Sequence, residues 1–67
     1  MKFVVELYAV LPDSSETLLY RASITAFDPA AARKEASRLL ARRERANFAH
    51  VLNAEGEIVY KIDKSRP

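Results

Sequence analysis

The segment 29–45 concentrates the residues that are best suited to bind anions. It holds six basic and two acidic residues, a net charge of +4, whereas the other fifty residues carry five bases and seven acids, a net charge of −2. Arginine binds phosphate or carboxylate oxygens in pairs because its guanidinium is a planar fork of N–H donors. The segment therefore predicts contact with a nucleic-acid backbone or with an acidic protein surface.

The helical spacing of these cations strengthens that interpretation. On a helical wheel, Lys34, Arg38, Arg42 and Arg45 form one outward stripe opposite the apolar residues of the same segment. The predicted binding residues are Arg33, Lys34, Arg38, Arg42 and Arg45. Two purely structural roles for these charges stay open: an exposed helix face is charged anyway, and bases late in a helix complement its dipole.

No residue is predicted to be catalytic. His50 is the single histidine, and we interpret it as a structural residue, since no Cys or second His completes a nucleophilic pair. Glu55 and Glu57 flank Gly56 and are interpreted as solubilising turn residues. The absence of Cys and the single Gly exclude thiolate metal sites and glycine-rich phosphate loops. We expect no enzyme activity, no metal and no cofactor.

Length and composition predict one small globular domain over 1–67. The chain has 67 residues, of which 49% are hydrophobic and 30% charged, and it contains no cysteine for a disulfide framework. The apolar run 3–11 is too short to cross a bilayer, is interrupted by Glu6, and lacks the features of a signal peptide. We expect a cytoplasmic protein with no membrane partner.

Alternation and turn residues predict four strands around one helix. The strands are expected at about 2–11, 17–27, 47–53 and 57–62, and the helix at about 29–44. Asp28 is the expected N-cap of the helix, and Pro29 suits its first position. The fold class is α+β: a four-stranded antiparallel sheet, ββαββ, with the helix packed on one face.

Each predicted strand has one face that should meet the helix. The helix should bury Ala32, Ala36, Leu39 and Leu40. The sheet residues expected to meet this stripe include Leu18 and Ile58, and also Phe48, His50 and Leu52 of the third strand.

The opposite sheet face is expected to be rich in apolar residues as well. It is expected to carry Val4, Tyr8, Val10, Leu19 and Phe27, together with Val51 and Val59. Contiguous apolar patches often mark contact surfaces, so we predict a homodimer or a protein partner there. The alternative is a solvated face with scattered apolar residues.

The junction between the second strand and the helix resembles that of a known group of proteins. Residues 24–37 read ITAFDPAAARKEAS, and the strand–strand–helix–hairpin order covers nearly the whole chain. This resembles small phage and prophage proteins, including some anti-CRISPR inhibitors. Archaeal ribosomal and other small housekeeping proteins show similar strand–strand–helix runs. The resemblance to the phage group implies a protein without catalysis that docks on a CRISPR surveillance complex and sets basic residues against its RNA-guided DNA path. Arg33 and Lys34 match the basic position of that pattern, and helical spacing adds Arg38 and Arg42.

The predicted function is a small, non-catalytic phage-type inhibitor that docks on a nucleic-acid-handling complex through its basic helix. A free-standing nucleic-acid-binding or regulatory domain is one alternative. A structural dimerisation module whose charges only solubilise it is the other.

Overall fold

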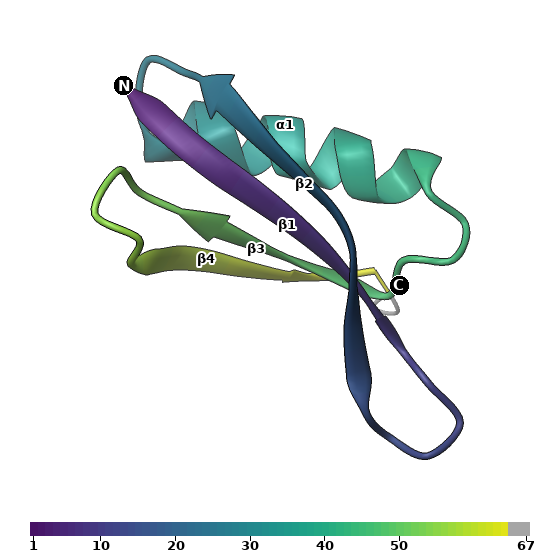
Figure 1. The fold of residues 1–67 in the computed structure, drawn as a ribbon. Helices are drawn as coiled ribbons and strands as arrows, with labels where there is room; N and C mark the ends of the chain where they lie inside the picture. Colours follow the sequence, from purple (N-terminus) through teal and green to yellow (C-terminus); the bar gives the residue numbers. More distant parts are fainter. Residues whose placement is uncertain (65–67) are drawn as a thin grey trace.

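The protein is a single antiparallel sheet with one helix packed on one face, as the sequence predicts (Figure 1). The structure is a computed structural model and describes residues 1–64. The strands are β1 (Lys2–Val10), β2 (Glu16–Thr25), β3 (Phe48–Leu52) and β4 (Ile58–Asp63), and the helix is α1 (Pro29–Arg42). The strand order in the open sheet is β2-β1-β3-β4, so the two hairpins lie side by side and the fold is α+β, ββαββ.

The predicted helix start is confirmed. The Asp28 carboxylate accepts a hydrogen bond of 2.8 Å from the Ala31 N–H, and Pro29 opens the helix. This bond satisfies one of the backbone donors that every helix leaves unpaired at its start. The helix ends at Arg42 instead of 44, because Arg43 turns into extended backbone while its N–H still bonds the Leu40 carbonyl at 3.2 Å.

The core lies between α1 and the sheet and is rich in small residues. The helix buries Ala32, Ala36 and Leu40, as predicted, and Leu39 lies half-buried beside them. The strands contribute Phe3, Val5, Leu7, Ala9, Ala49 and Val51, and Ala46 adds to the core from the connection that follows α1. Half of these ten buried residues are alanine, which lets the helix approach the sheet closely.

The predicted orientation of β3 is wrong. Phe48, His50 and Leu52 face away from the helix, while Ala49 and Val51 are fully buried beneath it. The cause is the register with β1, which pairs Phe48 with Tyr8 and His50 with Glu6, and so places all of them on one face. We call this uncovered sheet surface the open face.

Two bulges also change which side chains face the helix. Leu7 pairs with Tyr20 and Tyr8 with Leu18, so Leu19 is an extra residue in β2. Leu18 therefore moves to the open face and Leu19 to the helix side, the reverse of the prediction. In the second hairpin Val51 pairs with Tyr60 and Leu52 with Ile58, which leaves Val59 unpaired and moves Ile58 to the open face.

The helix covers the sheet unevenly. It packs mainly against β3 and β4, less against β1, and leaves β2 with the least cover. The tip of the β1–β2 hairpin projects beyond the two layers (Figure 1). Within residues 1–64, no helix has the length and apolar character needed to traverse a bilayer.

Candidate anion-binding groove

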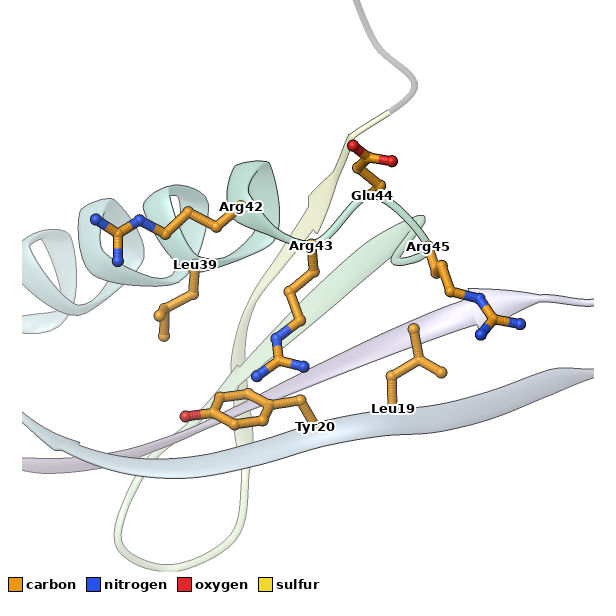
Figure 2. Close-up of a pocket in the computed structure, with 7 residues that line it drawn as sticks. All are labelled: Leu19, Tyr20, Leu39, Arg42, Arg43, Glu44 and Arg45. Carbon is orange, nitrogen blue, oxygen red and sulfur yellow. The ribbon is translucent and has the colours of Figure 1, made fainter.

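A groove opens where the end of α1 passes over the poorly covered strand β2 (Figure 2). Its volume is about 670 Å³. The residues that line it are Leu19 and Tyr20 of β2, Leu39 and Arg42 of α1, and Arg43, Glu44 and Arg45 of the turn that follows. We call this the basic groove.

The turn that carries two of the arginines is held at both ends. The Ala46 N–H donates to the Arg43 carbonyl at 3.1 Å, and the Ala46 side chain is buried in the core. The Lys64 ammonium donates to the same carbonyl, and the Lys64 N–H bonds the Asn47 carbonyl at 3.0 Å. These bonds fix the path of the chain from Arg43 to Asn47, so the arginines project from a defined backbone.

Arg43 is positioned by an aromatic ring. Its guanidinium carbon lies 4.0 Å from the centre of the Tyr20 ring, a cation–π contact (Figure 2). Such contacts stabilise by about 0.5–1 kcal/mol at exposed sites. The guanidinium carries five N–H donors, and an anion in the groove can accept hydrogen bonds from those that the ring does not cover.

The charge of the groove is strongly positive. Arg42 and Arg45 lie on either side of Arg43, and the Glu44 carboxylate points away from all three (Figure 2). Leu19 and Leu39 supply apolar surface between β2 and the helix. A partner that fits this groove carries anionic groups and also offers some apolar surface.

The cations predicted from helical spacing do not form one continuous ridge. Arg33 lies toward β4, with its guanidinium carbon 5.7 Å from the Tyr60 ring centre. Arg38 is engaged by Glu35 through hydrogen bonds of 2.6 and 2.8 Å, and Lys34 is exposed. Arg45 lies beyond the end of the helix, so the wheel position assigned to it does not apply.

The structure instead brings together Arg42 and Arg45 with two residues outside the predicted binding set, Arg43 and Tyr20. The run Arg42-Arg43-Glu44-Arg45 was the available signal in the sequence. Its members line one groove because the helix ends at Arg42, and sequence periodicity did not predict that end.

The residues predicted to form a contact surface on the second sheet face do not all lie on that face. Val4, Tyr8 and Val10 lie on the open face of β1. Leu19 lies in the basic groove, and Phe27, 96% exposed, follows the end of β2. Val51, also expected on this face, is buried in the core.

An aromatic cluster occupies the middle of the open face. The Tyr8 and Phe48 rings stack with centres 5.0 Å apart, and the His50 ring lies 5.1 Å from Tyr8 and 5.3 Å from Phe48. The Tyr8 hydroxyl donates to the Glu6 carboxylate at 2.7 Å, and Arg21 pairs with Glu6 at 3.5 Å. We call Tyr8, Phe48 and His50 the aromatic cluster.

Asp13 and Asn53 stabilise the two hairpin turns through their side chains. The Asp13 carboxylate accepts hydrogen bonds from the Ser15 N–H and hydroxyl, and these bonds lower the pKa of Asp13. The Asn53 side-chain oxygen accepts from the N–H groups of Glu55 and Glu57. No group of three or more His, Asp or Glu residues among residues 1–64 is arranged to hold a metal ion.

Comparison with known proteins gives no relative from which a role can be transferred: no family model, curated protein or solved structure matches the chain significantly.

Proposed function

We propose that this chain is a non-catalytic binding protein that docks on a nucleic-acid-handling complex through the basic groove. The observation that carries the proposal is that Arg42, Arg43 and Arg45 all line one groove, while the carboxylate of Glu44 is directed away from it. Three arginines that line one groove attract phosphate or carboxylate groups more strongly than isolated surface cations, because each charge adds to the same local potential.

The finer form of the proposal is an inhibitor of the phage or prophage type, similar to anti-CRISPR proteins and acting in the host cytoplasm. The resemblance of residues 24–37 supports it. In this form the groove binds the protein or RNA surface that borders the DNA path of a surveillance complex. The bound protein then blocks that path or changes its contacts with DNA, and no bond is made or broken.

A free-standing nucleic-acid-binding domain is the alternative, and the same groove supports it. In that case naked DNA or RNA occupies the groove. Affinity then falls steeply with salt, with a slope of log K against log salt of about −3 if three phosphates are neutralised.

The test compares a groove variant with a charge-reversal variant elsewhere on the same segment. Arg42→Glu/Arg43→Glu/Arg45→Glu reverses the groove, and Arg33→Glu/Arg38→Glu reverses cations outside it. The first assay is target-DNA binding by purified RNA-guided surveillance complexes in the presence of each protein. The second is fluorescence anisotropy with labelled duplex and single-stranded oligonucleotides, and circular dichroism checks the fold.

We expect the wild type and the Arg33/Arg38 variant to inhibit target binding, and the groove variant to lose inhibition. Tight binding of naked oligonucleotides by the wild type, lost in the groove variant, would favour the free-standing domain. If the groove variant matches the wild type in both assays, the groove does not mediate binding and the proposal is wrong.

A further inference from the structure

The open face carries large apolar side chains that the helix does not cover. The covered positions of β1 and β3 include Ala9 and Ala49, whereas neighbouring open positions hold Tyr8, Phe48 and Leu52. A core in which half of the buried residues are alanine provides little hydrophobic stabilisation for so small a domain. Domains of this size commonly gain the missing stability from disulfides, metals or oligomerisation, and the chain has no cysteine.

The apolar side chains of the open face form cross-strand rows. One row runs through Leu18, Tyr8 and Phe48, and a second through Val4, Leu52 and Ile58. The aromatic cluster joins the first row to His50. Leu18 and Ile58 are each 48% exposed, so both rows are partly exposed to solvent in the monomer.

The charges of this face are balanced. Its bases are Lys2, Arg21 and Lys61, and its acids are Glu6, Glu16 and Asp63. A nucleic-acid backbone needs an excess of bases, which this chain places instead at the end of α1. Arg21, Glu6 and Lys61 lie with His50 in one cross-strand row between the two apolar rows. The face therefore has no excess of one sign that would repel a second copy of itself, which a two-fold interface requires because it presents the same residues from both sides.

The area of the face reaches the minimum for a specific dimer. The four strands hold 9, 10, 5 and 6 residues, and at about 3.4 Å per residue and about 4.8 Å per strand they cover on the order of 500 Å². Two such faces bury about 1,000 Å², which is the smallest area expected of a specific interface.

We propose that two copies of this chain associate through their open faces and bury the aromatic cluster of each between them. The interface uses the sheet surface opposite the helix layer, so it leaves the basic groove of each copy accessible. The proposal is independent of what the groove binds.

The experiment measures the mass of the full chain in solution. Light scattering coupled to size-exclusion chromatography, over a wide concentration range, should give twice the chain mass of 7.6 kDa. The thermal unfolding midpoint should rise with protein concentration, because association stabilises the folded state by mass action.

Two variants locate the interface, and a third is their control. Tyr8→Lys places an ammonium beside Glu6, where the monomer tolerates it, but buries that charge in the dimer. Leu52→Lys places an ammonium in the second apolar row, where it is partly exposed in the monomer but buried in the dimer. Phe27→Lys removes an even more exposed apolar side chain that lies outside the open face.

We expect Tyr8→Lys and Leu52→Lys to be 7.6 kDa monomers with native circular dichroism, and Phe27→Lys to remain a dimer. If Tyr8→Lys fails to fold, Leu52→Lys decides the result. A monomeric wild type at every concentration would overturn the proposal, as would lysine variants that dimerise like the wild type. Oligonucleotide-induced NMR shift changes confined to the aromatic cluster would overturn it as well, in favour of a nucleic-acid surface.

Discussion

At the scale of single residues, two contacts hold the side chain of Tyr8 in place on the open face. Its ring stacks on Phe48 while its hydroxyl donates to the Glu6 carboxylate at 2.7 Å. This hydrogen bond raises the pKa of Tyr8 above its ordinary value of 10.0, because deprotonation would break the bond and set two negative charges side by side. The hydrogen bond thus favours the protonated, neutral form of Tyr8 in the aromatic cluster.

The first prediction concerns this pKa. Glu6→Gln should lower the pKa of one of the three tyrosines toward the ordinary value, as measured by tyrosinate absorbance against pH. Since the folded-state pKa is raised, the stabilisation is fully present below about pH 10 and disappears as the pH rises through the raised pKa. Tyr8→Phe assigns the signal by removing it. An unchanged titration in Glu6→Gln would show that the carboxylate is not the cause.

The second prediction concerns the helix N-cap. Asp28→Ala removes the acceptor for the Ala31 N–H and should lower the free energy of unfolding by about 1 kcal/mol, measured by urea denaturation. Asp28→Asn keeps a side-chain oxygen and should retain most of that stability. Equal destabilisation by both substitutions would mean that the cap bond is not the source of the effect.

At the scale of elements, the helix, β1 and β3 follow sequence periodicity, whereas bulges interrupt it in β2 and β4. The buried positions of α1 recur at helical spacing and its start carries the Asp28-Pro29 signal, so both were predictable. Alternation in β3 shows that two faces differ but does not say which one meets the helix. The larger side chains of Phe48 and Leu52 favoured the wrong face, because close helix packing needed alanine at position 49.

Bulges are the second reason that sequence reasoning failed. Leu19 lies in a continuous run of residues that favour strands, so the sequence gives no signal of a bulge there. The bulge nevertheless exchanges the faces of Leu18 and Leu19. The basic groove could not be predicted for a related reason. It depends on where α1 ends and on how much of β2 the helix leaves uncovered, and both follow from tertiary packing.

The third prediction tests close packing between the helix and the sheet. Ala36 is fully buried, so Ala36→Leu should overpack the core and destabilise the protein by about 1–3 kcal/mol. Ala41 is exposed on the same helix, and Ala41→Leu should change stability by less than about 0.5 kcal/mol. Urea denaturation measures both variants, and equal effects would argue against tight packing at position 36.

At the scale of the whole molecule, the two layers separate two kinds of surface. The end of the helix layer carries the basic groove, and the open face of the sheet carries apolar rows with balanced charge. Little core lies between them, since its largest fully buried side chains are Leu7, Val5 and Val51. Both surfaces therefore depend on a few residues for their relative position.

The fourth prediction follows from this thin core. A domain of 67 residues has a free energy of unfolding of roughly 3–10 kcal/mol, and Leu7→Ala should remove about 2–5 kcal/mol of it. We expect the variant to be largely unfolded at mild urea concentrations where the wild type stays folded. Leu11→Ala, at a 43% exposed position, is the control and should unfold like the wild type.

The tip of the β1–β2 hairpin is bonded mainly to itself. The Leu11 N–H donates to the Ser15 carbonyl and the Ser14 N–H to the Leu11 carbonyl, each at 2.8 Å, and the loop projects away from both layers (Figure 1). Because the chain has no cysteine, Ser14→Cys would create a single thiol there for a fluorescent dye. Energy transfer between dyes on two chains would then follow dimer formation in real time, and transfer to a labelled partner would follow binding. The dye would lie away from both the basic groove and the aromatic cluster.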